Sequence, residues 1–419
     1  MSVDAAIIGL GYVGLPLALE AARAGLSVIG FDINQGIVDS LNAGRSHIDD
    51  LSDEDVASMT QLGFVSTSEE ARLAEAKVVV ICVPTPLAED GGPDLRAVQS
   101  AVEAVARNLR PEMVVILEST TYPGTTEEVV LPKLEESGLI AGKDFCLAYS
   151  PERIDPGNPN YGPENTPKVV GGHTARCAES AADFYGQFVK TVVRTKGTRE
   201  AEMAKLLENT YRHINIALVN EMTRFCHELD IDLWDVINAA ASKPFGFQAF
   251  YPGPGVGGHC IPIDPNYLSH QVRARLGYPF RFVELAQEIN SGMPTYVVHR
   301  VQDILNDEHK SLRGATVLLL GVTYKANIAD QRESPAVPLA KQLIAKGAVV
   351  HYHDPHLSHW GAIGDGAIRV EEPADAVSTA DLTILVQNHR EYDVDSLAAA
   401  SRAFFDTRGV ANGMKVRRL

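Results

Sequence analysis

The sequence predicts an α/β protein with two Rossmann-like, doubly wound domains joined by a central all-α segment that contains one long helix. Short apolar runs without a polar face, each followed by a helical pattern, stand at residues 5–8 and 315–320. Such runs are typical of buried parallel strands. Between them, residues 199–229 contain neither proline nor glycine, and apolar residues recur at helical spacing. A chain of 419 residues is too long to fold around a single hydrophobic core. We therefore expect three segments, at residues 1–198, 199–308 and 309–419.

The composition is that of an ordinary soluble globular protein, with 45% hydrophobic and 22% charged residues. The cysteines are scattered, odd in number and without a C-x-x-C pair, which argues against a disulfide framework or structural zinc. They are Cys82, Cys146, Cys177, Cys226 and Cys260. The pattern favours a reducing, cytoplasmic compartment. The first apolar run is broken by glycines from Gly9 onward, so it predicts a strand rather than a signal peptide.

The net charge of −17 excludes most nucleic-acid and acidic membrane partners. No window approaches the roughly eighteen unbroken apolar residues of a membrane span. An anionic ligand is still possible where a few basic residues converge. Three basic residues near the end of the chain predict only a solvated terminus: Lys415, Arg417 and Arg418.

The first strand is followed at once by a glycine-rich turn, G-L-G-Y-V-G, a helical pattern over 15–24, a second strand over 26–31 and the acidic Asp32. The complete series is strong evidence for a dinucleotide site, although the glycine pattern alone is weak. The glycines let pyrophosphate reach the helix N-terminus, and Asp32 can accept bonds from the adenosine ribose. No arginine follows Asp32, which favours NAD over NADP. The cofactor contacts expected in the turn are Gly9, Gly11, Tyr12, Val13 and Gly14.

Polar residues follow three further apolar strands of the first domain. Thr85 comes after the strand at 78–83, the run Glu118 to Thr121 after the strand at 114–117, and the run Ser150 to Arg153 after that at 145–148. The carboxyl ends of parallel strands face the cofactor at the switch point of such a sheet. We therefore expect Thr85 to contact the cofactor, and the other two groups to converge on the same edge.

Within the long helix, Lys205, Asn209 and Arg212 stand at i, i+4 and i+7 and so share one face. A polar stripe of this kind is usually a solvated face, but it also suits an enzyme of anionic substrates. All-α segments such as 199–308 often bury an apolar face in a partner chain, so a homodimer is expected.

The segment Tyr251 to Asp264 reads Y-P-G-P-G-V-G-G-H-C-I-P-I-D. Glycine lets backbone approach a ligand closely, and proline stiffens the loop. A helical pattern begins at Asp264, so Cys260 stands just before a helix N-terminus, where the dipole favours thiolate. The alternative is a buried structural cysteine; the loop chemistry favours a catalytic nucleophile.

The last part of the chain predicts a second doubly wound sheet with an incomplete glycine pattern. Its strands are expected at 315–320, 349–353, 382–386 and 403–405, with a helix capped by Ser334-Pro335 and ended by Gly347. Lys325 and Arg332 are local cations suited to phosphate, so we expect a nucleotide other than the redox cofactor. Four histidines match no defensible ligand set, and no metal is expected: His351, His353, His356 and His359.

Taken together, these motifs resemble the UDP-sugar 6-dehydrogenase family over essentially the whole chain. The motifs that carry the resemblance are G-L-G-Y-V-G-L-P at 9–16, E-S-T at 118–120, S-P-E-R at 150–153, A-K-L-L-E-N-T-Y-R at 204–212, G-V-G-G-H-C-I-P-I-D from Gly255 to Asp264 and R-E-S-P at 332–335. The resemblance implies two NAD-dependent oxidations at one carbon, alcohol to aldehyde to carboxylate. A thiolate can trap the aldehyde and hold the acyl group while the cofactor is exchanged.

By resemblance, Cys260 is the nucleophile that forms the thiohemiacetal and thioester. Lys205 and Asn209 match a pair that stabilises oxyanions, which agrees with their shared helix face. Asp264 matches an acid–base partner, Glu152 a general base for thioester hydrolysis, and Thr120 a residue that orients water and cofactor. Arg332 matches a cofactor or pyrophosphate contact that reaches across a dimer. The substrate contacts implied by the resemblance are Arg153, Ile154, Lys205, Asn209, Arg212, Tyr251, Gly257, Tyr324 and Lys325.

One departure concerns the substrate. The UDP-glucose branch of the family resembles C-x-P-K-D at the nucleophile, whereas Ile263 stands here in place of the lysine. The G-G-H-C-I-P-I-D motif and the run Lys243 to Phe247 resemble the branch acting on UDP-N-acetylhexosamines, closest to UDP-N-acetylglucosamine. UDP-N-acetylmannosamine and UDP-glucose are alternatives. Two rival functions are a two-electron alcohol dehydrogenase and a non-catalytic regulator that binds nucleotide sugars.

Overall fold

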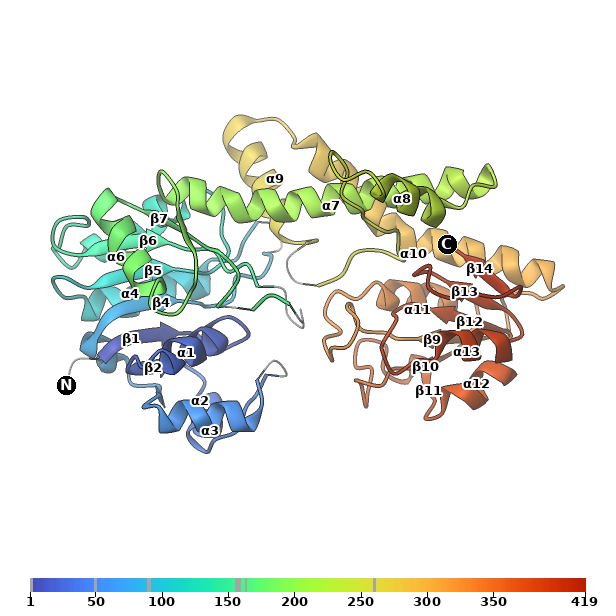
Figure 1. The fold of residues 1–419 in the computed structure, drawn as a ribbon, viewed down its shortest axis with the longest axis horizontal. Coiled ribbons are helices and arrows are strands. Elements are labelled where there is room, and N and C mark those ends of the chain that lie inside the picture. Colours follow the sequence, from blue (N-terminus) through green and yellow to red (C-terminus); the bar gives the residue numbers. More distant parts are fainter. Residues whose placement is uncertain (1–2, 49–50, 89–91, 155–159, 163, 259–260) are drawn as a thin grey trace. The chain divides into compact units, whose positions relative to one another are not determined.

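The computed structural model describes residues 3–48, 51–88, 92–154, 160–162, 164–258 and 261–419. The chain divides into two compact units, which are described separately: residues 1–208 with 266–277, and residues 209–265 with 278–419. The observed architecture confirms the predicted α/β fold with two Rossmann-like sheets and a helical segment between them in the chain (Figure 1). Among the described residues, no helix combines the length and apolar character needed to cross a bilayer.

Over the described residues, the first sheet has eight strands in the order β3-β2-β1-β4-β5-β6-β7-β8. Neighbouring strands pair in parallel, except β6 with β7, which are antiparallel. The strands are β1 Val3–Ile8, β2 Val28–Phe31, β3 Val65–Thr67, β4 Ala76–Ile81, β5 Val114–Leu117, β6 Cys146–Tyr149, β7 Lys168–Gly172 and β8 Val192–Arg194. The chain reverses direction of growth beside β1, and this produces the switch point that the sequence predicted.

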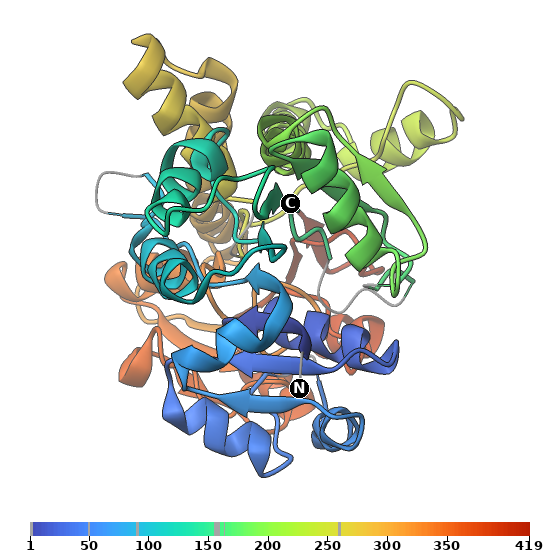
Figure 2. The ribbon, with the colours of Figure 1, turned by 90° about the vertical axis from the view of Figure 1, so that its left-hand side faces the viewer.

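Helices flank the first sheet on both sides (Figures 1 and 2). Ala5 and Ile7 of β1 pack on the side of α1, whereas Ala6 and Ile8 pack on the side of α4. This alternation follows from the two-residue period of a strand, and burial on both faces explains the absence of a polar face in the sequence. The helices are α1 Gly14–Arg23, α2 Gln35–Asn42, α3 Asp53–Gln61, α4 Arg96–Asn108, α5 Leu131–Glu135 and α6 Ala175–Tyr185, with shorter helical turns at Glu70–Glu75 and Thr126–Val130.

The central part of the chain is helical, as predicted. Its helices are α7 Thr198–Glu228, α8 Leu233–Ala241, α9 Asp264–Leu276 and α10 Arg281–Asp307. In the second unit, Ala217 of α7 packs against Ala286 and Ile289 of α10. The Asn220 amide also donates to the Asn290 side-chain oxygen at 2.9 Å, which satisfies two polar groups in a buried contact.

Over the described residues, the second sheet has six strands, all parallel, in the order β11-β10-β9-β12-β13-β14. They are β9 Thr316–Leu320, β10 Val349–His353, β11 Ile368–Arg369, β12 Leu382–Leu385, β13 Phe404–Asp406 and β14 Val416–Arg418. The helices that cover it are α11 Ala336–Ala345, α12 Pro373–Thr379 and α13 Val394–Ala400, with α10 on the face of α11, and a short turn lies at Gly364–Gly366. The predicted strand and helix positions agree with these bounds to within two residues.

Two expectations about this sheet can be compared directly with the structure. The expected solvated terminus is found only in part: Lys415 and Arg417 are exposed, but Val416–Arg418 form the edge strand β14 and Lys415 Nζ donates to the Ser401 carbonyl at 3.1 Å. The predicted Ser334-Pro335 cap is present, because Pro335 occupies the N-cap position of α11 and the Ser334 hydroxyl oxygen accepts from the Ala336 N–H at 3.3 Å. The same hydroxyl donates to the Val322 carbonyl at 2.8 Å and so also fixes the loop before the helix.

Candidate functional site

The glycine turn after β1 leaves no room for side chains on its inner side. Gly9 has φ +89°, and a Cβ on Gly14 would lie 1.9 Å from the Gly9 carbonyl oxygen. Gly11, by contrast, has nothing within 4 Å of its Cβ position. Tyr12 is 39% exposed and Val13 is the N-cap of α1. The turn therefore packs tightly against itself and leaves backbone accessible at the start of α1, as a bound pyrophosphate requires.

Asp32 follows β2 and lies beside this turn. Its Oδ2 accepts from the Leu10 N–H at 3.0 Å, and its Oδ1 accepts from the Asn34 N–H at 2.9 Å. The side chain is half-buried, so each oxygen retains a lone pair on the exposed side. The carboxylate is thus fixed in place with capacity for ribose hydroxyls. These residues fit NAD, whose role when bound is to accept hydride.

The ends of β4 and β5 meet, as predicted. The Thr85 hydroxyl donates to the Thr120 carbonyl at 2.7 Å, and the Lys205 ammonium of α7 donates to the Thr120 hydroxyl at 2.5 Å. The Tyr267 hydroxyl of α9 donates to the Thr85 carbonyl. Only 7% of Lys205 is exposed, so its charge acts in a poorly solvated place. A buried cation at the edge of the sheet can stabilise an oxyanion.

Glu152 lies at the end of β6 in a buried group that sequence reasoning did not find. Its Oε1 accepts from the Arg153 and Ile154 N–H groups at 2.8 and 2.6 Å, and its Oε2 accepts from the Lys168 ammonium at 3.2 Å. Lys168 also donates to Glu118, which is 1% exposed. Glu118 belongs to the predicted E-S-T motif, but within that motif a role was predicted only for Thr120. Lys168 gave no signal, since it begins a strand far from both glutamates in sequence.

Burial shifts the protonation of this group. It raises the pKa of the Glu152 carboxyl, against the opposing hydrogen bonds from the Ile154 and Arg153 amides and the nearby Lys205 charge. Burial also lowers the pKa of the Lys168 ammonium to about 7. The two shifts bring an acid and a base toward the same pH range, which is the condition for proton transfer near neutrality.

The Arg153 guanidinium is paired with Glu208 and with a backbone carbonyl. Its Nη2 contacts Glu208 Oε1 of α7 at 2.7 Å, and its Nη1 donates to the Pro167 carbonyl at 2.7 Å. The two residues of the predicted Glu152–Arg153 motif therefore have different partners: the carboxylate contacts Lys168, and the guanidinium contacts Glu208 of α7. A substrate contact by Arg153 would have to share or replace the bond to Glu208.

In the second unit, Asn209 of α7 and Asp264 are in direct contact. The Asn209 amide donates to Asp264 Oδ2 at 2.7 Å, and the two residues are 8% and 3% exposed. Asp264 is the first residue of α9, which confirms the predicted helix. Cys260 and the adjoining His259 lie outside the described residues. The contact therefore brings the amide of Asn209 to a carboxylate that stands four residues after Cys260 in the chain.

The glycine loop before Cys260 packs on the loop that follows β9. A Cβ on Gly257 would lie 2.8 Å from Tyr324 Cβ, and one on Gly258, where φ is +88°, would lie 2.6 Å from the Tyr324 ring. Tyr251 stacks on Trp234 with ring centroids 5.6 Å apart and its hydroxyl donates to Asn238 at 3.2 Å. The loop therefore needs glycine in order to lie against Tyr324.

The remaining predicted contacts are cations, of which Arg212 and Arg332 are exposed and Lys325 is half-buried. Arg212 is exposed, unlike Lys205 and Asn209, so the predicted stripe has a buried part and an exposed end. Arg332 contacts Asp330 with Nη2 and Oδ2 2.6 Å apart. Lys325 lies in the same loop as Tyr324 and offers its carbonyl to the Thr323 hydroxyl at 2.9 Å.

Comparison with known proteins adds a family assignment to this geometry. Three models of the UDP-glucose/GDP-mannose dehydrogenase family match the chain: the NAD binding domain at residues 3–189, the central domain at 199–292 and the UDP binding domain at 318–413. Together they account for most of the chain.

Similar proteins match over nearly their full length. UDP-N-acetyl-D-glucosamine 6-dehydrogenase of Pseudomonas aeruginosa is 35% identical over 412 residues, 96% of this chain and 96% of that protein. UDP-N-acetyl-D-mannosamine dehydrogenase of Methanococcus maripaludis is 33% identical over 418 residues, covering 96% and 92%. The solved structure of the UDP-D-ManNAc dehydrogenase of Pyrococcus horikoshii has a TM-score of 0.89 at 31% identity, covering 99% and 98%.

Proposed function

The chain belongs to the UDP-glucose/GDP-mannose dehydrogenase family, and from that premise we propose that it oxidises the C6 hydroxyl of a UDP-N-acetylhexosamine to a carboxylate. It is an NAD-dependent oxidoreductase. The observation that supports the proposal most is the buried Lys205 ammonium, which donates to Thr120 at the edge of the NAD-binding sheet. A dehydrogenase needs such a fixed charge where an alkoxide develops.

The proposed reaction has two oxidations at one carbon. In the first, the alcohol loses a hydride and a proton to give the aldehyde. The Cys260 thiolate then bonds to the aldehyde carbon, and the resulting thiohemiacetal loses a second hydride to give a thioester. Water adds to the thioester, the carbon–sulfur bond breaks, and the carboxylate and thiol are released. Each hydride is accepted by one NAD.

In this proposal the chain's polar residues have separate tasks. Lys205 stabilises the oxyanions from the Thr120 side, and Asn209 and Asp264 act as a hydrogen-bonded unit in the second unit. Glu152 activates the hydrolytic water, which its raised pKa and its contact with Lys168 support. Arg153, Ile154, Arg212, Tyr251, Gly257, Tyr324 and Lys325 are proposed to contact the substrate, and Arg332 the cofactor or the pyrophosphate.

Counting NADH per sugar consumed tests the reaction. We expect two NADH for each sugar, because both oxidations occur before the product leaves. A ratio of one would identify a two-electron alcohol dehydrogenase and remove the role of Cys260. No NADH with any UDP-sugar, together with intact UDP and NAD binding, would favour the regulator.

UDP-N-acetylglucosamine is our first choice of substrate, with UDP-N-acetylmannosamine second. Ile263 is 9% exposed, so the lysine of the UDP-glucose branch would place an ammonium in a poorly solvated position here. A panel of UDP-sugars followed by NADH absorbance decides among them. A strong preference for UDP-glucose would overturn this reading of Ile263.

We also propose that the working form is a homodimer. In the second unit, large apolar side chains are exposed on both α7 and α10, among them Leu218 at 54%, Phe225 at 46%, Phe282 at 67% and Leu285 at 53%. A second copy would remove this surface from water. Light scattering after size exclusion tests the assembly, and a monomer at micromolar concentration would reject it.

The division of the chain into three segments, 1–198, 199–308 and 309–419, is also part of the proposal.

A further inference from the structure

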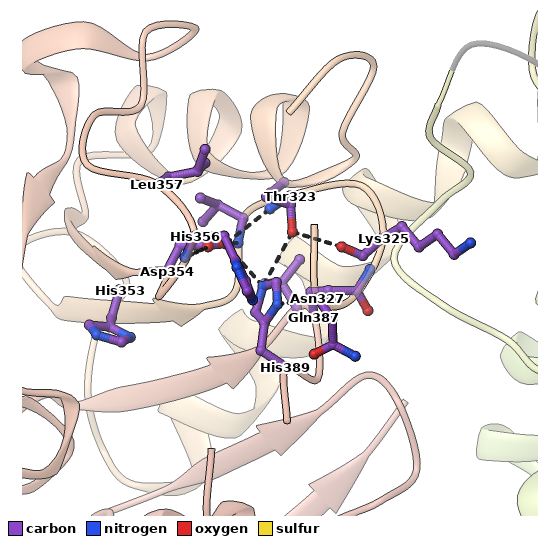
Figure 3. A network of polar contacts seen from close by, with 12 residues as sticks. Thr323, Lys325, Asn327, His353, Asp354, His356, Leu357, Gln387 and His389 are labelled. Atoms are coloured by element: carbon purple, nitrogen blue, oxygen red, sulfur yellow. Dashed lines mark hydrogen bonds and ion pairs between the residues drawn. The ribbon is translucent and has the colours of Figure 1, made fainter. Parts of the chain in front are cut away.

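Three strands of the second sheet end in one buried cluster. Asp354 follows β10, the loop from Gly321 to Asn327 follows β9, and His389 lies just after β12. In the sheet β9 lies between β10 and β12, so the carboxyl ends of these strands are neighbours. Both Asp354 and His389 are 0% exposed. Figure 3 shows the polar contacts that join them to Thr323.

The ring of His389 is bonded at both nitrogens. Nδ1 accepts from the Asn327 N–H at 2.9 Å, which requires an unprotonated Nδ1. The proton of the neutral ring is therefore on Nε2, which lies 3.1 Å from Asp354 Oδ2 and 3.2 Å from the Thr323 hydroxyl. His389 thus bridges two places in the loop after β9 and one place after β10.

Asp354 holds the same loop from the other side. Its Oδ2 accepts from the Val322 and Thr323 N–H groups at 2.7 and 3.2 Å, and its Oδ1 accepts from the His356 N–H at 2.9 Å. A stable carboxylate is therefore available as the anchor.

The loop between these anchors is fixed at each end. The Thr323 hydroxyl donates to the Lys325 carbonyl at 2.9 Å, and the Gln387 amide donates to the Tyr324 carbonyl at 3.0 Å. Asn327 has φ +64°, a conformation that asparagine adopts only at some cost unless its surroundings hold it. The His389 bond to the Asn327 N–H supplies that hold. Figure 3 shows the Lys325 side chain extending away from the cluster.

We infer that His389, with Asp354, is a positioning residue that fixes the loop 323–327 so that Tyr324 and Lys325 meet the uridine diphosphate of the substrate. The inference rests on the proposed UDP-sugar activity. Fixing the loop before the ligand binds removes an ordering cost from binding, which raises affinity without a new contact. A lysine held in this way can neutralise phosphate charge.

The same cluster offers a metal site as an alternative. One ligand atom each from His356, His389 and Glu391 lies within 4.8 Å of the others. However, His389 uses Nδ1 for Asn327 and Nε2 for Asp354, so a metal bond would cost one of these contacts. The bonding pattern favours positioning over coordination.

Two substitutions separate the two nitrogens. His389→Asn keeps an acceptor near the Nδ1 position, and His389→Gln keeps a donor near the Nε2 position. Titration calorimetry of the full-length protein with UDP measures the effect. We expect His389→Gln to weaken UDP binding by about tenfold, because the strained Asn327 loses its partner, and His389→Asn to weaken it less. NAD binding should change less than about twofold in both.

A double-mutant cycle distinguishes positioning from a general loss of stability. Lys325→Met should weaken UDP binding in the wild type but add little in His389→Gln, because the lysine is then already misplaced. Exposed His359→Gln removes a histidine from the same domain without touching the loop, and should leave UDP affinity unchanged. If the His389 variants do not fold, Thr323→Val removes only the hydroxyl and should still weaken UDP binding.

Several outcomes would overturn the inference: UDP affinity unchanged in folded His389→Gln, strictly additive effects with Lys325→Met, or UDP binding that depends on added Zn²⁺. Failure of the wild type to bind UDP would instead reject the proposed function. The two failures are therefore distinguishable in the same experiment.

Discussion

The two sheets share one framework around their first strand and differ in how they use it. Gly9 and Gly321 follow β1 and β9 with φ of +89° and +74°. Their N–H groups donate to the last residue of the neighbouring strand, at 2.9 Å in both cases. The next amide donates to a carboxylate, Leu10 to Asp32 and Val322 to Asp354. After that point the sheets diverge.

The divergence lies in what remains for a ligand. In the first sheet a short turn leads directly into α1, and Asp32 is half-buried with capacity for ribose. In the second sheet the Asp354 carboxylate is hydrogen-bonded to His389. A longer loop, which contains Tyr324 and Lys325, precedes α11. The same topology can therefore serve different nucleotides, because the carboxylate is offered to the ligand in one sheet and used internally in the other.

Matched alanine substitutions in the two turns should have the largest effect. Gly14→Ala puts a Cβ 1.9 Å from the Gly9 carbonyl oxygen and should abolish measurable NAD binding while UDP binding persists. Gly321→Ala puts a Cβ 2.3 Å from the Gln387 carbonyl oxygen and should do the reverse. Calorimetry with each nucleotide measures both. Gly162→Ala, which meets nothing within 4 Å and lies outside the glycine turn, is the control for folding. Normal NAD binding by Gly14→Ala would break the comparison.

Matched asparagine substitutions at the two carboxylates should give opposite results. In Asp354→Asn an amide would face buried N–H donors, and we expect the free energy of unfolding to fall by about 2–4 kcal/mol. In Asp32→Asn water can compensate, so stability should change by less than about 1 kcal/mol. NAD affinity should fall by about tenfold or more in Asp32→Asn, through the lost ribose bonds.

Urea unfolding gives the stabilities and fluorescence titration gives the NAD affinities. Equal stability losses in the two variants would show that the carboxylates serve the same purpose, contrary to the comparison.

Acid should destabilise the helical segment through one buried histidine. His213 of α7 is 1% exposed, and burial lowers its pKa to about 4. The unfolded chain binds a proton near the ordinary pKa of about 6.5, so stability is fully present above that pH and falls as the pH drops toward 4. The contribution is at most about 3 kcal/mol, and water entry reduces it.

Urea unfolding at several pH values between 7 and 4 measures this loss. His213→Gln should flatten the pH dependence, whereas exposed His359→Gln should not. If the two variants showed the same pH dependence as the wild type, His213 would not be the acid-sensitive group.

The sequence predicted those strands, helices and turns whose formation depends on residues close together in the chain. The strand Val114–Leu117 lies at the predicted residues, and the long helix Thr198–Glu228 begins and ends within one residue of the prediction. The carboxyl ends of β4 and β5 also meet as predicted, because parallel strands impose that convergence. The glycine turn and Asp32 were identifiable since fingerprint, helix and acidic residue follow one another in the chain.

Contacts between distant segments could not be predicted in this way. Lys168 pairs with Glu118 from 50 residues away, and His389 with Asp354 from 35 residues away. Neither residue belongs to a periodic pattern, and a lysine at the start of a strand gives no sign of burial. The strand at the basic terminus was missed for the same reason: β14 is short and, among the described residues, pairs with β13 alone, so the sequence predicted only its solvated charges.

The most direct test of the account is the product formed by Cys260→Ser with NAD and the preferred UDP-sugar. We expect uronic acid formation to be lost while NAD and UDP affinities are retained, with any aldehyde recovered as an oxime after hydroxylamine treatment. Wild-type amounts of uronic acid, with two NADH for each sugar, would contradict the covalent role of this sulfur.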